Sequence, residues 1–131
     1  MQAETINPTG WASPRGYSNG VLAEGSKVLF IAGQIAWDAE QRLVSDEFAV
    51  QFGQAIHNVV AIVQAAGGEA ANITRLLIFV TDKREYLAHV REVGAAYREA
   101  MGKHFPAMSL IEVKALLEDR AKVEIEATAV L

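Results

Sequence analysis

Apolar and polar residues recur along the chain with periods that change from one segment to the next. Residues 122–131 alternate strictly, which predicts a strand with one buried face and with Glu124, Glu126 and Thr128 on the other. Residues 73–81 form an almost continuous apolar run, which favours a strand covered on both faces. Residues 108–113, after Pro106, predict a further strand.

Two other segments repeat apolar residues at spacings of three and four, the pattern of amphipathic helices. The first spans about 20 residues, with Ser45 as its N-cap and Gly67-Gly68 at its end. The second begins at Asp82, where Glu85 completes a motif similar to a capping box, and ends near Gly102.

The N-terminal part of the chain combines turn formers with strand-like stretches. Residues 1–16 contain two clusters of Pro, Gly and small polar residues, which predict an irregular leading segment. Strands are predicted over 17–23 and 27–36, joined by Glu24-Gly25-Ser26 as a three-residue hairpin connection. Gly33, inside the second of these strands, indicates a bulge or a close backbone approach.

The resulting order is β-β-α-β-α-β-β, which predicts an α+β protein in one domain over residues 1–131, with two helices on one face of a mixed sheet. The opposite face would still present members of the 73–81 run, Leu110, and Phe30 or Ile31. Because so apolar a face is unfavourable in water, we expect another copy of the sheet to cover it. Any small-molecule cleft would then lie between subunits.

Composition narrows the class of protein. The 131 residues are 51% hydrophobic and 21% charged, which excludes disordered and fibrous chains, and the absence of cysteine excludes disulfides and thiolate chemistry. No apolar run approaches the ~20 residues of a membrane span, and no secretory signal is evident, so a cytoplasmic protein without a membrane partner is expected.

A net charge of −4 without a basic cluster disfavours nucleic acid as a partner. The three histidines lack metal-binding spacing, and no metal or other cofactor is expected.

Six short fragments stand out in series along nearly the whole chain. They are Gly16-Tyr17-Ser18, Ala32-Gly33-Gln34-Ile35, Ala65-Ala66-Gly67-Gly68, Phe79-Val80-Thr81-Asp82, Pro106-Ala107-Met108-Ser109 and Val123-Glu124-Ile125-Glu126-Ala127. In this order and at these spacings the chain resembles the Rid (YjgF) family of enamine/imine deaminases. The resemblance implies a chorismate-mutase-like fold, assembled as a homotrimer with three ligand clefts at the subunit interfaces.

The resemblance also implies site residues. Glu124 matches the Glu that in the family positions the water attacking the imine carbon, and one carboxylate can both activate water and pass a proton to departing ammonia. Tyr17 matches as the second expected catalytic residue, and the turn at Gly33 and Gln34, beside Ala32, is expected to bind substrate. A solvated or interface charge is the alternative for Glu124, and packing at a strand start is the alternative for Tyr17.

Four family positions are exchanged in this chain. The Arg that pairs with the substrate carboxylate is Met108 here, the Ser before Gly-Gln is Ala32, the Asn of the second helix is Gly94, and the Cys two places after the Arg is Leu110. A neutral thioether cannot replace a bidentate guanidinium. Arg15, two residues before Tyr17, is the candidate to supply the missing charge, with a plain surface Arg as the alternative.

Several other side chains lie near the expected cleft. Trp11 and Trp37 lie in or beside flanking loops and, with Met108, would favour a larger and more apolar ligand than a small imino acid. Ordinary aromatic cover of the loops is at least as good an interpretation. Glu126 is a candidate structural partner in a trimer, while His104 and Lys114 are better read as structural residues.

Two functions from different classes are consistent with these residues. The first is hydrolysis of an enamine, an imine or a related C–N compound in an inter-subunit cleft, with water activated by Glu124. The second is a trimeric protein that binds a small molecule in the same cleft without deaminase activity, because four site positions are exchanged. The ribonuclease activity of some relatives is disfavoured by the acidic charge and the lack of a histidine pair.

Overall fold

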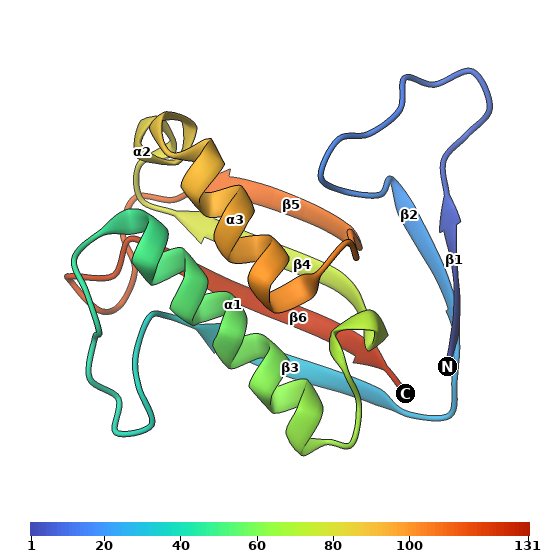
Figure 1. Ribbon diagram of the computed structural model, residues 1–131, viewed down its shortest axis with the longest axis horizontal. Helices are drawn as coiled ribbons and strands as arrows, with labels where there is room; N and C mark the ends of the chain where they lie inside the picture. The colour runs from blue at the N-terminus through green and yellow to red at the C-terminus, as the bar shows by residue number, and fades with distance from the viewer.

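The structure is a computed structural model that describes residues 1–131 (Figure 1). Four strands form a mixed sheet in the order β3-β6-β4-β5, and two others pair in a separate sheet, β1-β2. In Figure 1 the helices α1 and α3 cross the same face of the four-stranded sheet, so the predicted α+β architecture is confirmed. The elements are β1 (Gln2–Ile6), β2 (Gly20–Glu24), β3 (Val28–Gln34), α1 (Phe48–Ala65), the 3-10 turn η1 (Ala70–Asn72), β4 (Ile73–Val80), α2 (Lys83–Ala88), α3 (Val90–Met101), β5 (Ala107–Glu112) and β6 (Val123–Val130).

The core lies between the helices and the sheet. The inward stripe of α1 buries Phe52, Ile56 and Val59 against Leu76 of β4 and Ile125 of β6. β6 is antiparallel to both β3 and β4, and β4 is parallel to β5. The strict alternation of β6 therefore separates a buried face toward the helices from a half-buried face away from them. None of the helices combines the length and apolar character needed to cross a lipid bilayer.

The N-terminal region differs from the prediction in two respects. Residues 2–6 form the strand β1, although the turn formers of residues 1–16 predicted an irregular segment. All five residues of β1 are exposed, and the strand exists through backbone pairing with β2. The predicted hairpin at Glu24-Gly25-Ser26 is wrong, since β2 pairs with β1 and β3 pairs with β6. The C-terminus takes the place of a hairpin partner: the backbone N–H groups of Ser26 and Lys27 both donate to the Leu131 carbonyl.

The helices also differ from the prediction at two points. Glu47, not Ser45, occupies the N-cap of α1, and the Ser45 hydroxyl instead accepts a hydrogen bond from the Glu47 N–H in the preceding turn. The second predicted helix is divided into α2 and α3 at His89, whose Nδ1 atom lies 2.8 Å from the Glu85 carbonyl oxygen. Its predicted start is confirmed, because the Asp82 carboxylate accepts from the Arg84 N–H.

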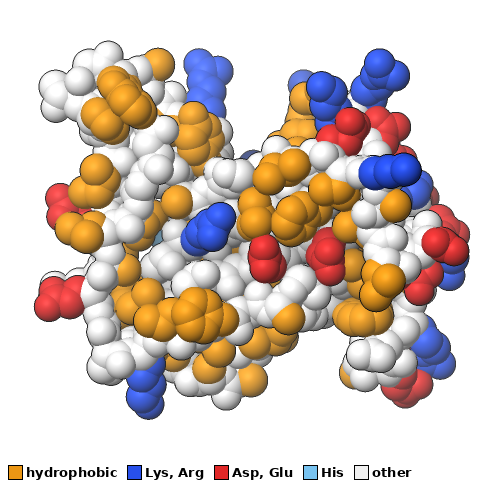
Figure 2. All heavy atoms as spheres, turned by 180° about the vertical axis from the view of Figure 1, so that it is seen from behind, with side chains coloured by type: hydrophobic (Ala, Val, Ile, Leu, Met, Phe, Trp, Pro, Cys, Tyr) orange, Lys and Arg blue, Asp and Glu red, His pale blue; other side chains and the backbone are white.

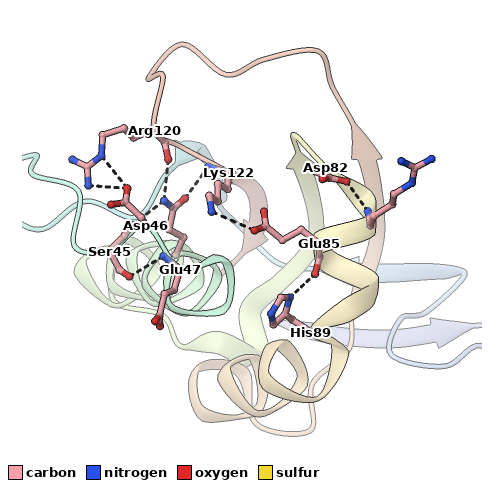
Figure 3. A network of polar contacts seen from close by, with 10 residues as sticks. Ser45, Asp46, Glu47, Asp82, Glu85, His89, Arg120 and Lys122 are labelled. Carbon is pink, nitrogen blue, oxygen red and sulfur yellow. Dashed lines mark hydrogen bonds and ion pairs between the residues drawn. The ribbon is translucent and has the colours of Figure 1, made fainter.

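A buried amide ties the start of α1 to the loop before β6 (Figure 3). The side chain of Gln51 is fully buried and donates to the carbonyls of Ser45 and Arg120, while it accepts from the Lys122 N–H. The ion pairs of Arg120 with Asp46 at 2.9 Å and of Lys122 with Glu85 at 3.3 Å lie around it. This network holds the segment that leads into β6 in place.

The sheet face opposite the helices is open. Figure 2 shows apolar side chains on this face with acidic and basic groups between them. Phe30 is 79% exposed, and Val28 and Ile111 are also exposed. Such an apolar surface agrees with the expectation of a covering copy, which remains a prediction.

Candidate functional site

A cavity of about 570 Å³ lies between α3 and the β4-β5 side of the sheet, beside the segment that precedes β2. Ten of its fourteen lining residues are hydrophobic, so its walls favour an apolar ligand. The lining residues are Arg15, Gly16, Tyr17, Phe52, Ile78, Tyr86, Val90, Val93, Gly94, Tyr97, Arg98, Phe105, Met108 and Leu110.

The cavity brings together residues that the sequence places far apart. Tyr17 and Arg15 come from the loop before β2, Gly94 from α3, and Met108 and Leu110 from β5. The loop is held against β5 because Ser18 donates from its N–H to the Pro106 carbonyl and from its hydroxyl to the Phe105 carbonyl. Three of the four positions at which the family residue is exchanged thus line one cavity, and each exchange makes its wall less polar.

The cavity contains no general base of its own in this protomer. No carboxylate or imidazole is among its lining residues. The Tyr97 hydroxyl donates to the His104 carbonyl at 2.6 Å, and burial raises the pKa of this phenol well above its usual range. Tyr17 is 41% exposed and forms no side-chain hydrogen bond. A reaction here that needs activated water therefore needs a group from elsewhere.

The carboxylate expected for that task lies in a second group of residues, at the β3 side of the sheet. Three residue steps along β3, from Ile31 to Gln34, oppose two along β6, from Ala127 to Ile125, which confirms a bulge at Gly33. A Cβ atom on Gly33 would lie 2.5 Å from the Glu124 Oε1 atom. The predicted close approach is thus confirmed, and it is the Glu124 side chain that Gly33 accommodates.

The neighbours of Gly33 complete this second group. The Gln34 amide donates to the Ala32 carbonyl at 3.1 Å, and Ala32 is exposed. The Glu124 carboxylate has no ion-pair partner among the five ion pairs of the chain. The oxygens of this carboxylate can therefore accept hydrogen bonds without competition from a paired cation.

One protomer does not bring the two groups together. Glu124 points to the open face, whereas Met108 faces the helices and the cavity. In the sheet order β3-β6-β4-β5 the bulge lies in one edge strand and Met108 in the other. The predicted residues therefore form two half-sites at opposite sides of the sheet: Arg15, Tyr17 and Met108 in one, and Ala32, Gly33, Gln34 and Glu124 in the other.

Other expected residues lie outside the cavity. Neither Trp11 nor Trp37 lines the cavity of a single chain, so a ligand wall of two indoles beside Met108 stays a prediction for the assembled cleft. The Trp37 carbonyl instead accepts from Asn58 of α1. His104 is structural, with its Nε2 atom 2.7 Å from the Ile73 carbonyl oxygen, and Lys114 lines a separate depression near Arg120.

Arg98 lines the cavity but was absent from the predicted site. It follows Gly94 by four residues on α3, and residues at this spacing share one face of a helix. The exchange at Gly94 was visible in the sequence, so the i,i+4 spacing could have identified Arg98 as well.

Known proteins resemble this chain over most of its length. The sequence model of the family Endoribonuclease L-PSP matches residues 10–131. The 2-iminobutanoate/2-iminopropanoate deaminase of Salmonella typhimurium is 38% identical over 109 residues, which cover 81% of this chain and 80% of that protein. The human protein of the same name is 30% identical over 115 residues, covering 87% of this chain and 79% of its own length.

Solved structures show the same relationship. The Rid-family protein YyfB of Yersinia pestis matches with a TM-score of 0.89 and 31% identity over the full length of both chains. The YjgF gene product of E. coli matches with a TM-score of 0.68 and 34% identity, over 97% of this chain and 98% of that one. The resemblance in the six sequence fragments is therefore confirmed, and the chain belongs to the Rid (YjgF) family, which the Endoribonuclease L-PSP model describes.

Proposed function

We propose that this protein hydrolyses an enamine or imine in a cleft completed by two copies of the chain. One copy contributes the cavity with Tyr17, and the neighbouring copy contributes Glu124. The observation that most supports this is the separation of the half-sites: the cavity has cations and apolar walls but no base, while Glu124 lies beside Gly33 near the other sheet edge.

A head-to-tail arrangement joins unlike edges. The β3 side of one copy then meets the β5 side of the next, and such heterologous contacts close into a ring when the rotation permits. A ring of three copies would contain three identical clefts and would cover the open sheet faces. The homotrimer and its cytoplasmic location, both expected from the sequence, belong to this proposal.

The reaction balances with water as the only co-reactant. An enamine first tautomerises to the imine. Glu124 of the neighbouring copy removes a proton from water as the water oxygen bonds to the imine carbon, and it delivers that proton to the nitrogen. The carbinolamine then collapses: Glu124 transfers the hydroxyl proton to the nitrogen, the C–N bond breaks, a C=O bond forms, and ammonia leaves. Tyr17 would hold the substrate through its phenol. Relatives named 2-iminobutanoate/2-iminopropanoate deaminase support this class of reaction.

The test is Glu124→Gln, with Glu92→Gln, at an exposed residue of α3 outside the cavity lining, as its control. Imino acids are produced in situ by an amino-acid oxidase, and their hydrolysis is followed in competition with semicarbazide. Loss of a positioned general base should lower kcat by about 10²–10⁴-fold, while the trimer and ligand affinity persist. The control should stay within about threefold of the wild type.

Two results would contradict the proposal. Full turnover by Glu124→Gln would remove Glu124 from the chemistry. Failure of the wild type to hydrolyse any imine across a panel of amino-acid precursors would favour the second candidate, a binding protein without turnover. That candidate has its own support, because Met108, Gly94 and Leu110 together leave the cavity wall without the polar groups of the family site.

A further inference from the structure

The cavity combines two guanidinium groups with no carboxylate. Arg15 and Arg98 line it, and no Asp or Glu does, although the whole chain has a net charge of −4. Arg98 is in none of the ion pairs of the chain, and the adjacent Glu99 lies 3.8 Å from His57. A local excess of positive charge in an apolar cavity favours an anionic ligand.

Arg98 lies beside a glycine of the same helix. Gly94 lies inside α3, where glycine is unfavourable for a helix relative to alanine. A Cβ atom on Gly94 would lie 3.4 Å from the Arg98 Nη1 atom. This is an ordinary van der Waals distance, so the Arg98 guanidinium lies beside residue 94 on the cavity side of α3 whether that residue is glycine or alanine. A cation in the last turn stabilises a helix in whichever direction its side chain points. Helix stability alone therefore does not require Arg98 to line the cavity.

The remaining walls define the other part of a ligand. Met108 and Leu110 of β5 face Phe52 and Val93 of the helices across the cavity. A volume of about 570 Å³ is in the range of sites for larger small molecules, well beyond a two- or three-carbon acid. Burial of additional carbon atoms against such walls strengthens binding.

We propose that Arg98 is the anion-binding residue of this cavity, and that the ligand is a carboxylate with a bulky branched or aromatic substituent. The guanidinium from α3 takes over the charge that Met108 removes from β5, and the apolar walls hold the substituent. This assignment deepens the proposed function, on which its place in a deaminase rests, by naming the substrate class: the imine of a large apolar amino acid.

The test measures binding of unreactive probes to the intact protein by calorimetry. The probes are 3-phenylpropanoate, its neutral amide 3-phenylpropanamide, and propanoate. The wild type should bind the aromatic acid more tightly than either of the others. Arg98→Gln should weaken binding of the aromatic acid by about 10–100-fold, the range of a charge-assisted contact, and change amide binding less than about twofold.

Two variants make the result specific. Arg91→Gln makes the same change of charge on α3 outside the cavity lining and should leave all affinities within about twofold. Gly94→Ala should raise the melting temperature, because alanine favours a helix, and should leave binding of the acid within about twofold, because its Cβ atom would lie at an ordinary contact distance from Arg98. A purely structural role for Arg98 would instead lower the affinities for acid and amide alike in Arg98→Gln.

Equal affinity for acid and amide, or loss of the acid preference in Arg15→Gln but not in Arg98→Gln, would overturn the assignment. Because the probes have no imine, this result is separable from the proposed function. Failure of the wild type to prefer the acid over the amide, with Glu124-dependent turnover intact, would contradict the assignment alone. Normal acid binding without turnover of any imine would contradict the deaminase proposal alone.

Discussion

At the scale of single residues, the exchange at position 108 has the most direct chemical consequence. Met108 lies on β5 opposite Leu76 of β4 and faces the cavity. It presents a thioether where the family has a guanidinium, so a small imino acid with little apolar surface loses a charge-assisted bidentate contact there.

We therefore expect weak turnover of 2-iminopropanoate and 2-iminobutanoate by the wild type. Met108→Arg should raise kcat/KM for these small substrates by about tenfold or more, mainly through KM. Met108→Gln, which is polar but uncharged, is the control and should give little increase. Efficient wild-type hydrolysis of both small imines would show that the Arg98 contact is sufficient without a bulky apolar substituent.

At the scale of elements, the long connections are ordered by a few side chains that bond to backbone groups. Gln51 joins α1 to residues on both sides of the core through three hydrogen bonds, to Ser45, Arg120 and Lys122. Its amide has no access to water, so no solvent can replace these bonds when it is removed.

Gln51→Leu should lower the free energy of unfolding by about 2–4 kcal/mol, because it keeps the side-chain volume and leaves buried backbone groups unpaired. Gln64→Leu changes the same groups on the exposed surface of α1 and should have little effect. Urea titration at one fixed protein concentration measures both, since assembly contributes to apparent stability. Equal stability of the two variants would show that the network is dispensable.

At the scale of the whole molecule, the open sheet face and the divided site lead to the same expectation. A face with Phe30, Val28 and Ile111 exposed requires a cover, and the half-sites require a second copy. Closed rings of heterologous contacts satisfy both conditions at once.

With the three copies that the family resemblance implies, the wild type should sediment at roughly 43 kDa, three times 14.2 kDa. Phe30→Glu introduces a charge into the expected interface and should give a species near the monomer mass with no imine hydrolysis. Leu87→Glu, at a residue 61% exposed on α2, should keep both the assembly and the activity. Monomeric wild type at micromolar concentration, or an active Phe30→Glu monomer, would contradict the divided site.

The local pattern of apolar residues was sufficient to predict an element wherever one repeat length extends over the whole segment. The alternation in β6, the stripe of α1 and the glycines after α1 and α3 predicted those elements because burial on one side imposes the period directly. Gly33 was predicted as a bulge because a glycine within a strand has few other uses. The resemblance placed Tyr17 and Glu124 among the expected site residues, but it had no bearing on Arg98.

Pairing and position required the tertiary structure. The polar β1 has no periodic signal. β3 pairs with β6 because the C-terminus returns beside Lys27, where Lys27 and Leu131 bond to each other across 104 positions of the chain. Local sequence could not show that Glu124 and Met108 lie on opposite faces and near opposite edges of the sheet, because that depends on the strand order. The sequence by itself thus determined the elements and the chemical character of the site residues. The long-range hydrogen-bond pairing of the strands decided which of those residues share a cavity.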